Sequence, residues 1–494
     1  MAGAALLAYT SLKTPRRDGG GGAAVLDPPQ PAPGVSARPP AAVLPPRVQP
    51  IGPPPVARAF SPRDRRIFGW ILLTVCALIA AIGEIGASRP ILIFGAAGVA
   101  LLMVVLAPEL VLALFLISGA IKAAAWMPAI PLDFTLFTWV LMVLAMISAA
   151  LRPGGIPRFP RTALVAVALV AIVVASVWWS VDPTAGFSKA VKFEILTMAG
   201  FAAPLLLIRD RAALTRLMLA LTGGGLLIAL TTVTTNNTGE PLSVAGGNEI
   251  TAGLYPALGL IAALGYLALL PRGWRLAGFL PVIILLPAVV AAGSRGVLVA
   301  CALALAYVVV RHIACSKRPL LSAVVVGVAL LVIAQLATSL AGGAAAKYES
   351  SLLSTNASQV LGERQFLYDR GVRLALNHPI AGIGVGGFAT SSIVYENELY
   401  PHNIVLELAS EEGYIAVLIL GFLIGGAWWA RRRTPGGLRT PEAVVTGGLI
   451  ILGVTEGFFS FDINGNRIIW FALGLAFALP QLRIGKPSDA APSG

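Results

Sequence analysis

Long runs of apolar residues recur along the chain from about Ile67 to Pro480. Each run is close to the ~20 residues that a helix needs to cross the ~30 Å hydrocarbon core of a membrane. Because lipid offers no partners to backbone N–H and C=O groups, each run is expected to form a helix, whose hydrogen bonds are internal. The pattern gives fourteen candidate spans, at residues 67–84, 90–107, 109–126, 132–151, 162–179, 190–208, 212–233, 250–270, 276–292, 296–313, 319–341, 404–430, 443–460 and 467–481. Pro108 alone separates the second span from the third, and the last is short, so we expect twelve to fourteen transmembrane helices in an all-α polytopic membrane protein.

The composition supports this class. Of the 494 residues, 57% are hydrophobic and 12% are charged, whereas about 25% of the residues of a soluble domain are charged. If the N-terminus is cytoplasmic and the spans alternate, 26 of the 36 Lys and Arg residues fall on the cytoplasmic side, and sixteen of the 23 acidic residues fall on the other. This bias obeys the positive-inside rule and predicts that both termini are cytoplasmic. Orientation and anionic membrane lipids then account for the net charge of +13, and no nucleic-acid partner is expected.

Polar segments flank and interrupt the predicted transmembrane domain of residues 67–481. Residues 1–66 contain fourteen prolines and a run of glycines, which predicts a disordered cytoplasmic tail. They lack the apolar stretch and cleavage site of a secretory signal. Residues 482–494 form a second, short cytoplasmic tail, and residues 342–403 form one large periplasmic loop with a helix that we expect to carry part of an active site. The three cysteines, Cys76, Cys301 and Cys315, are not spaced for an extracellular disulfide or a thiolate metal site.

Cationic residues gather in the segments predicted to be periplasmic. Arg295, within Gly293–Gly296, stands between two apolar runs. It is either an interfacial residue that ends a helix hairpin or an anion-binding residue at a helix start, and the sequence leaves both open. In the large loop, apolar residues recur at helical spacing over Leu361–Pro379, which predicts an outer helix. On this helix Arg364 and Arg370 have no acid three or four residues away, so each is available to bind a phosphate.

His402 and Asn403 lie where this loop re-enters the membrane. Near pH 7 an imidazole can take a proton from a sugar hydroxyl, so His402 is the candidate general base, with a structural role as the alternative. Asn403, Glu407 and Glu412 are expected to support the site. Because Glu407 is five residues beyond His402, the two do not share a face of one helix, and a carboxylate that orients His402 can come from another segment.

The remaining polar clusters favour structural roles. Lys189 and Lys192 are expected to snorkel to the membrane interface rather than to bind phosphate. Four glycines between Gly382 and Gly387 predict a flexible or tightly turned segment, but no lysine with Ser or Thr follows them, so they do not form a P-loop. The acidic residues lack the spacing of a metal-binding motif, and we expect no metal and no cofactor.

Three elements, in this order, resemble the bacterial O-antigen ligase superfamily. They are Ser294-Arg295-Gly296, the arginine helix running into Pro379-Ile380-Ala381-Gly382-Ile383-Gly384, and His402-Asn403 followed by Leu406-Glu407 and Gly413 at the start of the next span. The resemblance covers roughly residues 285–430. Ala416 replaces a glycine that is frequent in the family, and Tyr368 replaces a common tryptophan. Both are packing positions, so no proposed chemical group is lost.

The resemblance implies a GT-C-type helical bundle that transfers sugars on the periplasmic face without a metal. The donor would be a glycan on undecaprenyl diphosphate, and the acceptor would be a hydroxyl of lipid A–core for a ligase, or of another glycan for a polymerase. Carried over by position, Arg295 and Arg364 would bind the diphosphate, with Arg370 as the alternative to Arg364. His402 would be the base, and direct attack would invert the anomeric centre.

The sequence therefore predicts an inner-membrane glycosyltransferase of the ligase type. A repeat-unit or exopolysaccharide polymerase shares the same pattern and is the alternative. A flippase for lipid-linked sugars would need charges deep within the spans, for which the candidates are Lys122, Glu194 and Glu456. A scaffold acting through the proline-rich tail is the non-catalytic alternative.

Overall fold

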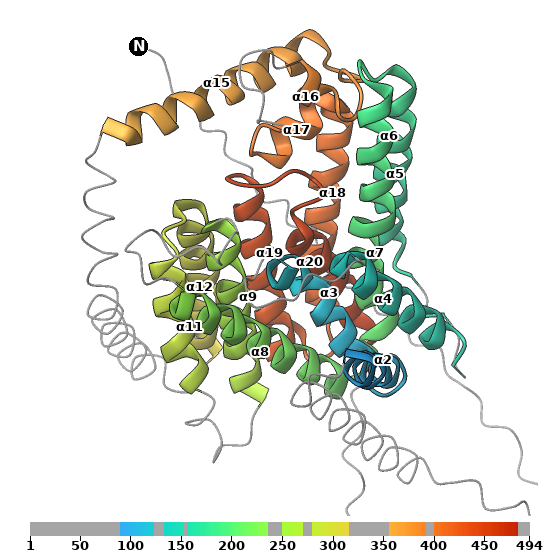
Figure 1. The fold of residues 1–494 in the computed structure, drawn as a ribbon, viewed down its shortest axis with the longest axis vertical. Coiled ribbons are helices and arrows are strands. Elements are labelled where there is room, and N and C mark those ends of the chain that lie inside the picture. The colour runs from blue at the N-terminus through green and yellow to red at the C-terminus, as the bar shows by residue number, and fades with distance from the viewer. Residues whose placement is uncertain are drawn as a thin grey trace, which may run out of the picture. The chain divides into compact units, whose positions relative to one another are not determined.

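Every regular element among the residues that the structure describes is a helix (Figure 1). The computed structural model describes residues 89–122, 133–152, 156–157, 159–235, 249–269, 279–315, 355–391 and 400–482, all within the unit Phe60–Gly494. The α-helices are α2 (Arg89–Leu106), α3 (Pro108–Lys122), α4 (Phe134–Ala150), α5 (Val165–Ser176), α6 (Pro183–Lys192), α7 (Met198–Leu207), α8 (Arg211–Thr235), α9 (Glu249–Leu269), α11 (Leu280–Ala291), α12 (Arg295–Cys315), α15 (Thr355–Asn377), α16 (Gly387–Thr390), α17 (Ile404–Glu411), α18 (Tyr414–Ala430), α19 (Pro441–Gly457) and α20 (Arg467–Ala478). Short 3-10 turns extend α5, α18 and α20, and a π-helical stretch joins α6 to α7 at Phe193–Thr197.

Five of the described helical stretches are long and apolar enough to cross a membrane. They are Arg161–Trp179, Pro183–Leu207, Arg211–Thr231, Arg295–Cys315 and Tyr414–Arg433. Four shorter apolar helices lie at Phe134–Ala150, Glu249–Gly265, Leu280–Ala291 and Arg467–Gln481. These helices confirm an all-α polytopic membrane protein. The count of twelve to fourteen spans and the GT-C-type bundle stay predictions, because candidate spans 67–84 and 319–341 lie outside the described residues, as do the tail 1–66 and residues 483–494.

The predicted span 404–430 is not one helix, and this prediction was wrong. α17 ends at Glu411, and α18 begins at Tyr414. Between them Gly413 has φ 83° and ψ 175°, a conformation reserved for glycine. The amide of Tyr414 donates instead to the carbonyl of Pro379, at 2.8 Å. The break lets α17 leave the direction of the membrane-spanning α18.

The predicted span 190–208 begins earlier than expected. Asp182 caps the start of α6, because its side chain accepts hydrogen bonds from the amides of Thr184 and Ala185. Pro183 occupies the first turn, where its missing N–H costs nothing. As a result Lys189 lies within a continuous helical stretch rather than at its boundary.

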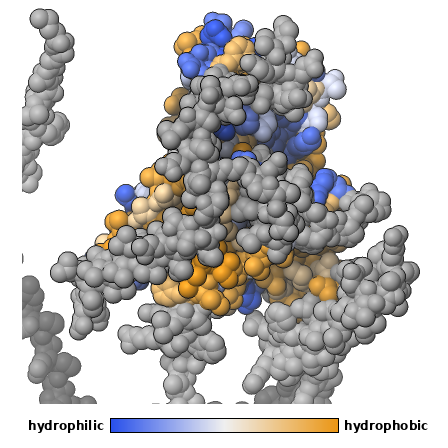
Figure 2. Space-filling model, turned by 60° about the vertical axis from the view of Figure 1, so that its left-hand side comes forward, coloured by the Kyte–Doolittle hydropathy of each residue, from blue (hydrophilic) through white to orange (hydrophobic). Residues whose placement is uncertain are grey.

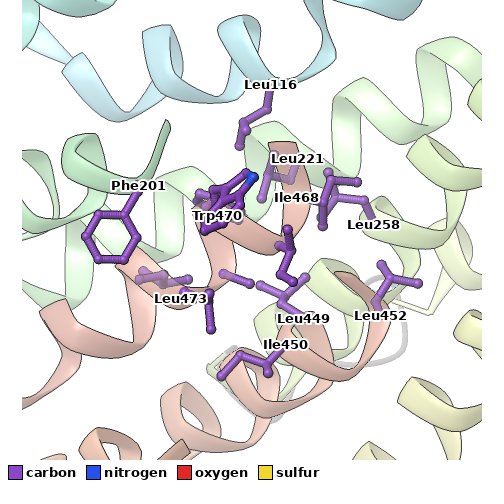
Figure 3. Packing of buried hydrophobic residues seen from close by; sticks show 14 of the residues in the cluster. Leu116, Phe201, Leu221, Leu258, Leu449, Ile450, Leu452, Ile468, Trp470 and Leu473 are labelled. Atoms are coloured by element: carbon purple, nitrogen blue, oxygen red, sulfur yellow. The ribbon is translucent and has the colours of Figure 1, made fainter. Parts of the chain in front are cut away.

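The core of the described bundle surrounds α20. Figure 3 shows Trp470 and Leu473 of α20 packed among Leu449 of α19 and apolar residues of α7, α8 and α9. The indole N–H of Trp470 is satisfied by the carbonyl of Ile463, at 2.9 Å. A side chain on Gly474 would lie within 2.9 Å of the backbone of Phe201, so this glycine allows α7 and α20 to approach closely.

Cations predicted to be cytoplasmic meet at one end of the described bundle. Arg209 donates to the carbonyl of Ala149 at 2.7 Å, and Arg211 pairs with Glu442 at 2.6 Å. Arg216 likewise pairs with Glu109, and Arg152 donates to the carbonyl of Val105. At the other end lie α15, α16 and α17, where hydrophilic residues gather in Figure 2, whereas the visible coloured surface lower in the view is mostly hydrophobic. Which end faces the cytoplasm stays a prediction.

Candidate functional site

The start of α17 holds His402 in an unusual backbone conformation. Its φ is 53°, in the left-handed region that few residues other than glycine adopt. Asn403 follows at φ −154°, and its side chain caps α17 by accepting hydrogen bonds from the amides of Val405 and Leu406, at 3.0 and 3.1 Å. The half-buried His402 ring packs against the ring of Tyr400, with centroids 4.6 Å apart. The cap and this ring contact together fix where the imidazole lies.

The end of α19 is the surface on which this segment rests. A side chain on Gly457 would lie 3.1 Å from Ile404, the first residue of α17. The hydroxyl of Tyr368, on α15, donates to the carbonyl of Phe458 at 3.3 Å. α15 also packs on α17, as Figure 1 shows, because Gly371 leaves room for Leu406. α15 and the start of α17 thus meet the end of α19 at residues 456–459.

The start of α12 reaches the same place. Arg295 is the exposed first residue of this helix, whose N-terminal end carries positive potential. A side chain on Gly296 would lie 2.7 Å from Phe459 and 3.7 Å from Oε2 of Glu456. The end of α19 therefore links the first residues of α12 to the first residues of α17, and the two predicted motifs converge.

The two arginines of α15 have different surroundings. Being six residues apart, Arg364 and Arg370 point to different faces of the helix. Arg364 is half-buried and acts electrostatically on Glu456, beside α12. Arg370 instead donates to the hydroxyl of Ser391 at 3.3 Å and lies 6.0 Å from the ring centre of Phe388. Of the two, Arg364 is on the side where the motifs converge.

A buried ion-pair cluster lies on the other face of α17. Nζ of Lys189 is 2.5 Å from Oε1 of Glu407 and 2.6 Å from Oε2 of Glu411. Both carboxyl groups are fully buried, and only 13% of the Lys189 side chain is exposed. The expectation that Lys189 snorkels to the interface was wrong, because the earlier start of α6 brings it against α17. Glu407 thus anchors α17 through Lys189.

Glu412 is buried beside this cluster. It is 1% exposed, and neither of its carboxyl oxygens makes a hydrogen bond within the described residues. Burial, with the negative charge of Glu411 second, raises the pKa of Glu412 well above its ordinary range. Burial therefore favours the neutral form of the Glu412 carboxyl group.

The glycine-rich segment after α15 is a packed turn. The amides of Ile383 and Gly384 donate to the carbonyls of Ser410 and Glu411, at 2.9 and 2.8 Å. The amide of Val385 donates to Ser176 on α5, at 3.0 Å. With these N–H groups used, the segment ties α17 to α5 and α6 and does not form a phosphate cradle.

Sequence reasoning found most of the residues that converge, but it did not assign Glu456 or Lys189 to the site. Glu456 is fully buried at the end of an apolar helix. An acidic residue is costly to bury in an apolar span, and its presence there was the signal available in the sequence. Among the described residues, no group of three or more His, Cys, Asp or Glu side chains is arranged to hold a metal ion.

Comparison with known proteins gives one family match, within the segment that carries the predicted motifs. Residues 280–421 match the family described as O-antigen ligase. This match covers 142 of the 494 residues, and it supports the resemblance to the O-antigen ligase superfamily. The matched segment runs from α11 into α18 and so contains Arg295, Arg364, Arg370 and His402. The family supports an O-antigen ligase or polymerase type of function for this multi-pass membrane protein. No curated protein sequence matches the chain.

Proposed function

We propose that this chain is an inner-membrane glycosyltransferase that moves a glycan from undecaprenyl diphosphate to a hydroxyl of an acceptor sugar. The observation that carries the proposal is the convergence of Arg295, Arg364 and His402 on the end of α19. Two cations and one imidazole are the groups that a diphosphate leaving group and an attacking hydroxyl require.

His402 is the general base in this proposal. It takes the proton of the acceptor hydroxyl as the oxygen attacks the anomeric carbon of the donor's first sugar. The bond from that carbon to the diphosphate oxygen breaks, and undecaprenyl diphosphate leaves with the bonding electron pair. Because attack is direct, the anomeric configuration inverts. The strained backbone of His402 supports this role, since such strain persists where the surrounding structure imposes it, and it clusters at functional sites.

Arg295 and Arg364 bind the diphosphate and stabilise the charge that develops on it. Arg295 adds its guanidinium to the positive end of α12, which favours anions. Arg364 acts electrostatically on Glu456, which supports its placement on the side of α15 that faces the end of α19. Arg370 is the less suitable partner, because its contacts with Ser391 and Phe388 direct it towards α16.

We place both termini in the cytoplasm and the site on the periplasmic face. The grouping of Arg152, Arg209, Arg211 and Arg216 at the end opposite α17 supports this orientation. A lipid-linked donor then reaches the site from the outer leaflet.

The test uses the purified chain in lipid nanodiscs, an undecaprenyl-diphosphate glycan and two competing acceptors, lipid A–core and the glycan itself. Product on lipid A–core is the expected result and identifies a ligase. Chain growth on the glycan would instead identify a polymerase of the same superfamily. If neither product forms while labelled donor crosses the bilayer of sealed vesicles, the chain is a transporter and the proposal is wrong.

A further inference from the structure

Lys189 neutralises buried carboxylates that belong to the helix of His402. Glu407 and Glu411 are one turn apart on α17, so their carboxyl groups leave the same face and reach the same ammonium. Glu412 and Asp462 also act on Lys189 electrostatically. In the part of the chain that the structure describes, no second cation pairs with Glu407 or Glu411. Without Lys189, two buried carboxyl groups would lose their counter-charge, so they would either take up protons or destabilise the fold.

The same cluster joins three segments of the chain. Oε2 of Glu407 accepts a hydrogen bond from the amide of Ile463 at 2.9 Å, while its Oε1 faces Lys189. The side-chain amide of Asn464 donates to the carbonyl of Lys189 at 3.2 Å, and Thr197 donates to Asn464 at 3.0 Å. The side chain of Lys189 therefore ties α6 to α17, and its partner Glu407 and its backbone carbonyl both hold the loop 461–466.

Both tied segments lead directly into the proposed site. Glu407 lies on the helix that Asn403 begins, next to His402. The loop 461–466 follows the end of α19, where Glu456 and Gly457 contact α12 and α17. The two described non-glycine residues with positive φ, His402 and Phe461, stand at the entrances of these two segments. A restraint shared by both segments is what such strained positions need in order to persist.

We propose that Lys189 is a positioning residue of the active site: by pairing with Glu407 and Glu411 it fixes α17 and the loop 461–466, and so sets His402 against the diphosphate-binding arginines. Its effect on catalysis rests on the function proposed above. Lys189 does not touch the substrate. Its loss is expected to lower the rate of the chemical step more than the affinity for the donor, because misplacement of a reacting group by about 1 Å can cost about 100-fold in rate.

The experiment compares Lys189→Met, Lys189→Arg and Lys192→Met in the full-length chain in nanodiscs. Lys192 is the matched control, because it is exposed and lies one turn further along α6. The first readout is hydrogen–deuterium exchange of the peptides that contain α17 and Ile463. The second is glycan transfer, with kcat and the KM for the donor measured separately. A fourth variant, Lys189→Met with Glu411→Gln, removes one uncompensated carboxylate and serves if Lys189→Met alone does not fold.

In Lys189→Met we expect the Ile463 amide to exchange at least about tenfold faster and kcat to fall at least about tenfold, with the donor KM changed by less than about threefold. Lys189→Arg should recover most of both losses, and Lys192→Met should resemble the wild type. A folded Lys189→Met variant with wild-type exchange, or with faster exchange and wild-type kcat, would overturn the inference while leaving the proposed function intact. If the wild type transfers no glycan, the proposed function fails, and exchange at Ile463 still decides whether Lys189 restrains these segments.

Discussion

Replacing Gly413 with alanine tests whether the break between α17 and α18 is built into the fold. With φ 83° and ψ 175°, Gly413 occupies a region that costs about 1–3 kcal/mol for other residues. An added Cβ would lie 2.9 Å from the amide nitrogen of Ala381 and would overlap the carbonyl of Ile380. Overpacking of this kind costs about 1–3 kcal/mol more. The expected loss in free energy of unfolding is therefore about 2–6 kcal/mol, a large part of the ~5–15 kcal/mol that stabilises a typical protein.

The assay is thermal unfolding in detergent and in nanodiscs, followed by glycan transfer of the surviving folded protein. Gly421→Ala is the matched control, because Gly421 lies on α18 with no heavy atom within 4 Å of an added Cβ. Alanine is the better helix former by about 1 kcal/mol, so this control should keep or raise the melting temperature. Gly413→Ala should melt several degrees lower and lose transfer. Equal melting temperatures for the two variants would refute the reasoning, because they would show that α17 and α18 join without the glycine conformation.

Two further predictions concern the arginines of α15 and the buried Glu412. Arg364→Ala should lower kcat/KM for the donor about 10- to 100-fold, which is the contribution of one hydrogen bond between charged groups. The loss should be at least about tenfold greater than in Arg370→Ala. Equal losses in steady-state assays would contradict the assignment of Arg364. Burial raises the pKa of Glu412 in the folded state, so the folded chain retains a proton that the unfolded chain releases. The stability from this group is therefore fully present below the ordinary glutamate pKa, and it is lost as pH rises towards the folded-state pKa. Melting temperature should therefore fall between pH 5 and 8 in the wild type and less steeply in Glu412→Gln, and parallel curves would show that Glu412 is ionised in the fold.

The sequence predicts the helices well because lipid leaves the backbone no alternative. The candidate span 296–313 became α12 at Arg295–Cys315, and 212–233 became α8 at Arg211–Thr235. Prediction failed where a tertiary contact overrides local preference. Nothing in the apolar run 404–430 indicates that the backbone at Gly413 turns to meet the carbonyl of Pro379.

The site was predicted as a set of motifs rather than as an arrangement. His402 and Arg295 were found because a titratable group and a cation stand out beside apolar spans. Their convergence depends on the end of α19, which carries no motif of its own. The pairing of Lys189 with Glu411 joins residues 222 positions apart, and residue type alone favoured the membrane interface for that lysine. Distances of this kind along the chain are set by packing, which a single sequence does not reveal.

The central claim is that His402 removes the proton from the acceptor hydroxyl, and its most direct test is the transfer rate of His402→Ala. The measurement uses purified protein with saturating undecaprenyl-diphosphate glycan and acceptor, under single-turnover conditions. His378→Ala is the control, because His378 is an exposed histidine that follows α15 directly. We expect a loss of about 10²- to 10⁴-fold in His402→Ala and a rate close to wild type in His378→Ala. A His402→Ala variant that transfers glycan at the wild-type rate would show that His402 is not the general base.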